Sequence, residues 1–211
     1  GGFGCFLLVR YLTGDSLAAF LSGLIFAFWV GRVHYISHLS LASIQWFPYC
    51  ALYLIKTLRE KSYRNPVLAA IFLSMNALSS WYYAIYMSLF VALFLLYSAW
   101  AERKIFFTVS CLKRIGLIGI IFLVIMSPVL YPMMTEIFGG EDYMVSPVFV
   151  LDSASPNALL LPHINHLFLA KYMRSFYLKH GLPLQWGLAG GSFIGYTTIL
   201  LCLYTIFKLR H

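Results

Sequence analysis

The sequence predicts an all-α fold: a polytopic transmembrane helix bundle with one long extracytoplasmic loop. First, 61% of the 211 residues are hydrophobic and only 10% are charged, whereas a soluble domain has roughly 45–50% apolar and 25% charged residues. Second, long apolar runs alternate with short charged clusters, which predicts about six to seven membrane spans or part-spans. The residues 1-211 are therefore expected to form a single transmembrane domain that contains the loop 135-186.

The net charge of +8 lies in these short clusters and not along one exposed face, so we expect no nucleic-acid partner. The four cysteines have no metal-site spacing and are expected to act as small apolar packing residues. The chain has no initiator Met and begins directly in an apolar run. We therefore expect a fragment of a longer membrane protein.

Two apolar runs occupy residues 3–30, the first as the tail of a span and the second as a new span. Between them, Gly14 allows the chain to turn, and Asp15 or Ser16 can cap the next helix. A third span is expected over residues 39–55, with a kink at Pro48, and it ends in the charged loop 56–64.

The polar stretch 31–48 is the main candidate site. As a helix it would place four side chains on roughly one face, with Arg32 at its start: His34, Ser37, His38 and Gln45. Polar groups at membrane depth indicate function, although an interfacial helix would have the same pattern. Arg32, His34 and His38 fit a phosphate, and a divalent metal ion is the alternative ligand of the histidine pair.

No residue between 66 and 100 is charged, and one straight helix over this segment would be ~52 Å long against a hydrocarbon core of ~30 Å. We therefore expect a turn at Asn76, Ser79 and Ser80. The aromatic residues 81–83 beside it suit the membrane interface or a sugar ring. A charged cluster at 102–104, a short apolar piece ending at 113–114, and a span over 115–134 follow.

The loop 135-186 carries further candidate residues. Its acids Glu141, Asp142 and Asp152 are candidates for a general base. His163, His166 and Arg174 are candidates for binding substrate or phosphate. Residues 170–180, which include Arg174, are expected to form a basic interfacial helix. A last span is expected over 188–207.

The distribution of Lys and Arg predicts the orientation. One side of the proposed spans would hold eleven of these residues and the other side four, which are Arg32, Lys171, Arg174 and Lys179. The positive-inside rule places the larger group in the cytoplasm. We therefore expect a multi-pass protein of the cell membrane with cytoplasmic basic loops. The stretch 31–48, the turn at 79–81 and the long loop would then share the extracytoplasmic face.

Several motifs resemble the multi-spanning membrane glycosyltransferases of the GT-C superfamily. They are Arg32-Val-His-Tyr-Ile-Ser-His-Leu, Gln45-Trp-Phe-Pro, Leu78-Ser-Ser-Trp-Tyr-Tyr-Ala and the segments 12–28, 152–166 and 193–201. The resemblance implies sugar transfer from a polyprenyl-phosphate donor to an acceptor on the extracytoplasmic face, with membrane lipids as further partners. The family's key acid sits in the first outer loop, which we expect to lie upstream of this fragment, so no catalytic role is transferred.

Two other classes remain open. A membrane transporter or flippase could line a permeation path with the polar stripe, although no internal repeat is visible. A non-catalytic membrane scaffold is the third hypothesis.

Overall fold

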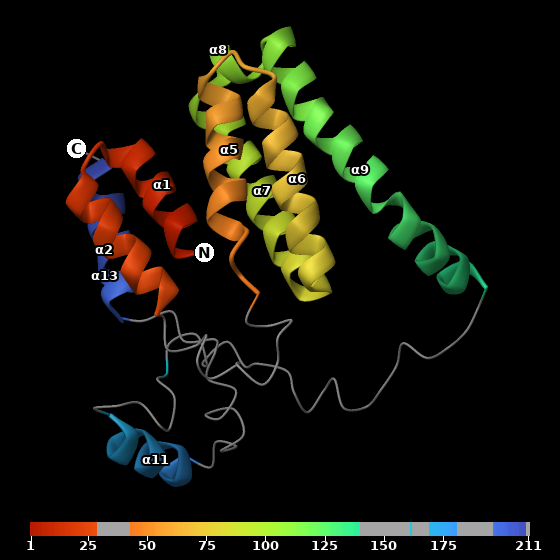
Figure 1. Cartoon of the computed structure of the whole chain (residues 1–211). Coiled ribbons are helices and arrows are strands. Elements are labelled where there is room, and N and C mark those ends of the chain that lie inside the picture. Colours follow the sequence, from red (N-terminus) through yellow and green to blue (C-terminus); the bar gives the residue numbers. More distant parts are fainter. Residues whose placement is uncertain (29–42, 140–160, 162–168, 181–195, 210–211) are drawn as a thin grey trace. The chain divides into compact units, whose positions relative to one another are not determined.

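The structure is a computed structural model that describes residues 1–28, 43–139, 161, 169–180 and 196–209 (Figure 1). Within these ranges every regular element is a helix and none is a strand, so the all-α prediction is confirmed. The chain divides into two compact units, unit 1 (Gly1–Gly140) and unit 2 (Glu141–His211), and each is described by itself. The single domain 1-211 and its extracytoplasmic loop stay predictions.

Unit 1 begins with a helical hairpin of α1 (Gly2–Thr13) and α2 (Ser16–Ala27). The chain turns at Gly14, whose φ of 72° lies in the left-handed region that glycine tolerates. Asp15 caps α2, because its side-chain oxygen accepts the backbone N–H of Leu17 at 2.8 Å and of Ala18 at 3.2 Å. The predicted turn and cap are confirmed.

The helices α5 (Phe47–Arg59) and α6 (Arg64–Ser79) follow the first gap in the described residues. Pro48 lies in the first turn of α5, where its missing N–H costs no hydrogen bond. Pro48 therefore lies at the start of this helix. The expected kink at Pro48 within a span over 39–55 is wrong. Gln45 lies in a turn outside the helix, so the expected helical face does not extend to this residue.

The predicted break after α6 is confirmed: Ser80 is extended, with φ −167° and ψ 134°, and α7 (Trp81–Ala101) begins directly after it. The short α8 (Arg103–Phe106) leads to α9 (Val109–Phe138), a helix of 30 residues. Its start includes residues 113–114, which we had placed in a separate apolar piece. Its end runs past Met134, the expected limit of the span, because neither of its two prolines ends the helix.

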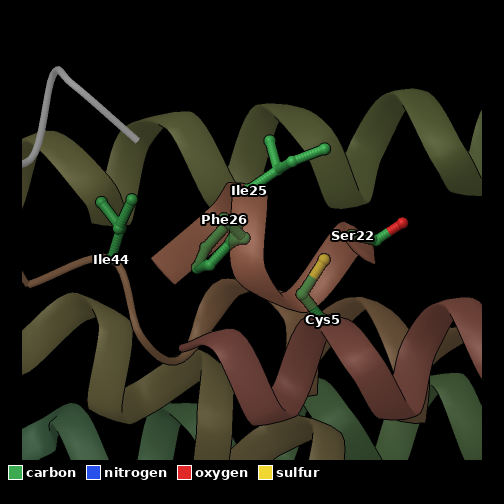
Figure 2. Close-up of a pocket in the computed structure, with 5 residues that line it drawn as sticks. All are labelled: Cys5, Ser22, Ile25, Phe26 and Ile44. Carbon is green, nitrogen blue, oxygen red and sulfur yellow. The ribbon is translucent and has the colours of Figure 1, made fainter. Parts of the chain in front are cut away.

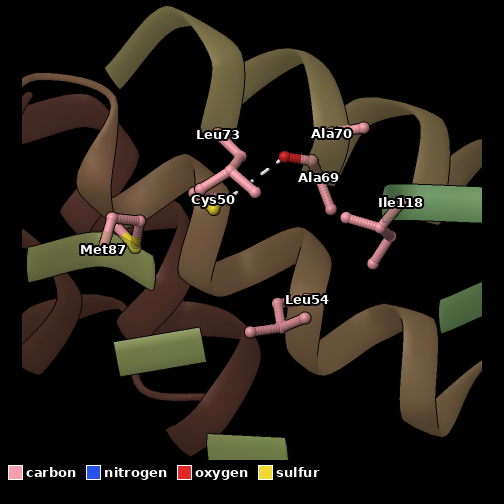
Figure 3. Packing of buried hydrophobic residues seen from close by; sticks show 7 residues of the cluster. All are labelled: Cys50, Leu54, Ala69, Ala70, Leu73, Met87 and Ile118. Carbon is pink, nitrogen blue, oxygen red and sulfur yellow. Dashed lines mark hydrogen bonds between the residues drawn. The ribbon is translucent and has the colours of Figure 1, made fainter. Parts of the chain in front are cut away.

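The core of unit 1 lies where α5, α6, α7 and α9 meet (Figure 3). Its buried residues are Cys50, Leu54, Ala69, Ala70, Leu73, Met87 and Ile118. Small side chains on α6 allow neighbouring backbones to approach closely, and the Cys50 thiol lies 3.9 Å from the Ala69 carbonyl oxygen.

Unit 2 contains α11 (Ala170–Lys179) and α13 (Tyr196–Leu209). The helix expected over 170–180 is confirmed as α11. The expected last span, 188–207, overlaps α13, and residues 188–195 lie outside the described ranges.

The number of spans needs correction. Among the described helices, two are long and apolar enough to cross a membrane, α7 and α9, and not six to seven. At about 1.5 Å per residue, α5 is ~20 Å long and α6 ~24 Å, short of a hydrocarbon core of ~30 Å. The apolar runs predicted where helices form. Most of the described helices are shorter than the full spans that we expected, because turns interrupt the apolar runs.

Candidate functional site

Unit 1 has two chemically different ends. We define the basic end as the C-terminus of α1, the turn before α2, and the connections α5–α6 and α7–α8–α9 (Figure 1). Contacts of Glu60 with Tyr11 and with Arg114 bring these parts together. Every Lys and Arg that the structure describes in unit 1 lies at this end: Arg10, Lys56, Arg59, Lys61, Arg64, Arg103, Lys104, Lys113 and Arg114.

The opposite end, here called the aromatic end, is where α5 begins, α6 ends and α7 begins. It carries Trp46, Phe47 and the aromatic residues 81–83. Among the described residues of unit 1, Glu136 is the one charged side chain outside the basic end. The helices α2 and α9 start at the basic end and run toward the aromatic end.

Most predicted site residues lie outside the described residues: Arg32, His34, His38, Glu141, Asp142, Asp152, His163 and His166. Their positions in the chain still matter. Residues 29–42 join the end of α2 to the start of α5, and residues 140–160 follow the end of α9. Both segments therefore connect to unit 1 at its aromatic end. Arg174 is described and is exposed on α11.

An aromatic stack fastens α5 to α6 near the aromatic end. The ring of Phe72 stacks on Tyr49 at 4.9 Å, on Tyr53 at 5.7 Å and on Trp46 at 5.9 Å between ring centroids. All four rings are partly buried. Their contacts with one another cover much of their ring surface and help to hold α5 against α6. Trp81 and Tyr82, by contrast, are exposed and offer ring surface for a ligand or for lipid.

Asn76 is the one buried side chain in the described part of the chain with an unpaired polar atom. Its amide nitrogen donates to the Phe72 carbonyl at 3.0 Å, while its amide oxygen has no partner there. A buried acceptor without a donor costs free energy. Asn76, one of the polar residues that predicted the turn, is thus a buried amide in the last turn of α6.

Glu60 organises the basic end. Its carboxylate accepts a hydrogen bond from the Asn65 amide at 2.9 Å and another from the Tyr11 hydroxyl, and lies 3.9 Å from the Lys56 ammonium. The Asn65 hydrogen bond has the largest effect and lowers the pKa of Glu60; burial opposes it, and the Tyr11 hydrogen bond and the Lys56 charge lower the pKa further.

Arg114 joins α9 to the same cluster. Its guanidinium donates to the backbone carbonyl of Glu60 and, at 3.2 Å, to that of Ser110. Only 4% of Arg114 is exposed, which the count of Lys and Arg used to predict the orientation does not reveal. Its neighbour Lys113 is exposed, and no local pattern separates the two residues, because the Glu60 partner lies 54 positions away.

A cavity of about 430 Å³ opens beside α1 and α2, lined by Cys5, Ser22, Ile25, Phe26 and Ile44 (Figure 2). The Ser22 hydroxyl donates to the Ala18 carbonyl of its own helix at 2.7 Å. None of these five lining side chains is charged, and the one hydroxyl among them is bonded within its own helix, so this part of the cavity suits hydrocarbon better than a sugar or a phosphate.

Within the described ranges, no three His, Cys, Asp or Glu side chains come together as metal ligands. Comparisons with protein-family models, characterised proteins and solved structures found no match to the chain. The resemblance to GT-C glycosyltransferases therefore stays an expectation.

Proposed function

We propose that this chain is the helical membrane part of a multi-pass protein, with the basic end in the cytoplasm. The observation that carries the proposal is the placement of every described Lys and Arg of unit 1 at one end of its helices. Membrane proteins retain such residues on the cytoplasmic side.

The surface of α7 supports this location. Exposed aromatic rings lie near both of its ends: Trp81, Tyr82, Tyr97 and Trp100. At about 1.5 Å per residue, Trp81 and Trp100 are ~28 Å apart along the helix, close to the ~30 Å hydrocarbon core. Exposed apolar side chains fill the length between them: Ile85, Leu89, Phe90, Leu93 and Leu96. Aromatic rings at both interfaces with mostly apolar side chains between them are typical of a membrane span.

For the activity, we propose transfer of a sugar from a polyprenyl-phosphate donor to an acceptor at the aromatic end, on the extracytoplasmic face. Support comes from the resemblance and from the connectivity of the chain. The segments that carry Arg32 and His34, and Asp142 and Asp152, both connect to unit 1 at this end. The exposed ring of Trp81 there can stack on a sugar.

The orientation is tested with single cysteines and a membrane-impermeant maleimide on intact cells. Tyr82→Cys at the aromatic end should react on intact cells, and Lys61→Cys at the basic end should react only after permeabilisation. Both wild-type side chains are exposed, so the protein itself shields neither site. The reverse pattern, or equal labelling without permeabilisation, would contradict the proposed orientation.

The activity is tested with the full-length protein in vesicles that contain a radiolabelled polyprenyl-phosphate sugar. Arg32→Ala, or His34→Ala with His38→Ala, should reduce sugar transfer while membrane insertion is unchanged. Unchanged turnover would contradict the assigned phosphate-binding role. Movement of the lipid-linked sugar across the membrane without a new glycosidic bond would favour the flippase alternative.

A further inference from the structure

The helix α11 has an exposed surface of one charge sign. Lys171, Arg174 and Lys179 are all exposed, and α11 contains no acidic residue. The chain contains no Asp or Glu after Asp152. The sequence after Asp152 therefore supplies no Asp or Glu side chain to neutralise these cations.

The two sides of α11 differ in how they are covered. Tyr177 is only 2% exposed, and Met173, four residues earlier and thus on the same side, is partly covered. At roughly 100° per residue, Lys171 and Lys179 lie on the other side of the helix, and Arg174, three residues before Tyr177, lies exposed at the edge of the covered side. Exposed apolar and aromatic side chains accompany them: Tyr172, Phe176 and Leu178. One side of α11 is thus covered, and the rest of its surface is open, basic and aromatic.

We propose that this open face of α11 docks onto the anionic lipid head groups of the bilayer. The proposal rests on the proposed membrane location of the chain. The lysine and arginine charges complement phosphate groups, and the Tyr172 and Phe176 rings suit the boundary between head groups and acyl chains.

The position of α11 in the chain favours this occupant. It lies between α9, which is apolar enough to span a membrane, and the apolar α13. The connections contain 31 residues from Gly139 to Leu169 and 16 from His180 to residue 195. A helix tethered on both sides stays near the surface, so weak electrostatic attraction is enough to hold it there.

The expected strength follows from the number of cations. Each Lys or Arg near an anionic leaflet increases binding about fivefold, corresponding to ~1 kcal/mol. Replacing all three should therefore weaken docking by roughly a hundredfold. Glutamine is the suitable replacement, because its helix propensity is close to that of lysine and arginine.

The experiment uses the whole chain in nanodiscs of phosphatidylcholine, with or without phosphatidylglycerol. Ser175→Cys places a thiol between Lys171 and Lys179, and Cys5→Ala with Cys202→Ala removes two competing thiols. Cys50 and Cys111 are buried. An uncharged hydrophilic maleimide measures access to the thiol. The anionic discs should slow its labelling at least fivefold, and K171Q/R174Q/K179Q should restore the rate.

A matched triple variant at the basic end, K61Q/R103Q/K104Q, removes the same charge from unit 1 and should leave the protection of Ser175→Cys unchanged. Equal labelling in both lipids, whether fast or slow, would overturn the proposal. Protection in neutral discs only after polyprenyl phosphate is added would also overturn it, because it would indicate a specific phosphate ligand.

Failure of the chain to insert would disprove the membrane location separately. In that case, flotation of the same protein with phosphatidylglycerol vesicles tests whether α11 binds anionic lipid. Flotation that K171Q/R174Q/K179Q abolishes supports docking by α11, and flotation that this variant leaves unchanged overturns it.

Discussion

The helices α5 and α7 belong to one packed unit but are covered in opposite ways. α5 contains two cations and a threonine, yet six of its 13 residues are buried. α7 has no charged residue, yet only three of its 21 residues are buried. In a water-soluble protein the more apolar helix would form the core. The proposed membrane location accounts for the reverse arrangement, because a lipid bilayer would surround α7 with groups as apolar as the helix itself.

The largest expected effect tests the outer surface of α7. Leu93 is 57% exposed near the middle of the helix, and Ile105 is 53% exposed in α8 at the basic end. Against water, an arginine at either position should change stability by less than ~0.5 kcal/mol. In a bilayer, Leu93→Arg should cost about 2.5–3.5 kcal/mol of insertion free energy, because the charge would lie in hydrocarbon.

The measurement is the fraction of chain that resists alkaline extraction from membranes. Leu93→Arg should reduce it strongly, and Ile105→Arg should leave it near the wild-type value. Equal behaviour of the two variants would remove the distinction between the surfaces of α7 and α8.

Sequence reasoning predicted the elements that depend on local chemistry. The Gly14 turn, the Asp15 cap and the break at Ser80 each follow from a few adjacent residues, and the structure confirms them. Helix length was harder to predict, because α9 continues through residues 113–114 and through both of its prolines. Where a helix ends in such cases depends on contacts with other helices, and the Arg114–Glu60 contact is one of them.

The candidate site was predictable only as a position in the chain. The residues Arg32, His34 and Asp142 were chosen because polar groups are rare in this sequence, and their roles stay predictions. The buried Arg114 and the unpaired Asn76 oxygen could not be predicted, because burial depends on residues far away in the chain. A count of Lys and Arg placed the nine described cations of unit 1 on one side, as the structure does, but could not show which of them is buried, and their cytoplasmic location stays a prediction.

A second, smaller effect tests the close packing of α1 against α2. In a bilayer, such packing replaces the hydrophobic driving force that joins helices in water. A Cβ on Gly23 of α2 would lie 2.9 Å from the Gly2 carbonyl oxygen of α1, a backbone atom that cannot rotate away. Gly23→Ala should therefore force the hairpin apart and destabilise it by about 1–3 kcal/mol.

Gly116 of α9 provides the matched control, since a Cβ there would meet no atom within 4 Å. Gly116→Ala should stabilise its helix by about 0.5–1 kcal/mol, because alanine loses less backbone entropy than glycine. Unfolding by a denaturing detergent in lipid micelles measures both changes. Destabilisation by both alanines, or by neither, would show that close approach at Gly23 does not hold the hairpin.

The smallest effect tests the charged contacts at the C-terminal end of α5, whereas α7 contains no charged residue. Hydrogen bonds from Asn65 and Tyr11 and the charge of Lys56 lower the pKa of Glu60 in the folded protein. The folded state then binds fewer protons than the unfolded state between the two pKa values. The contribution of Glu60 to stability is therefore complete above its ordinary pKa of 4.5 and is lost as the pH falls through the lower, folded-state value.

Glu60→Gln measures this contribution. The Glu60 side chain is 40% exposed, so solvent screening limits the difference from wild type to a few tenths of a kcal/mol at neutral pH. The difference should shrink as the pH falls below 4.5, because the wild-type carboxylate becomes neutral as well. Added salt should weaken the Lys56 part of the effect and leave the Asn65 hydrogen bond in place. A stability difference that does not change with pH would contradict this, because it would indicate that packing of the Glu60 side chain, and not its charge, stabilises this end of α5.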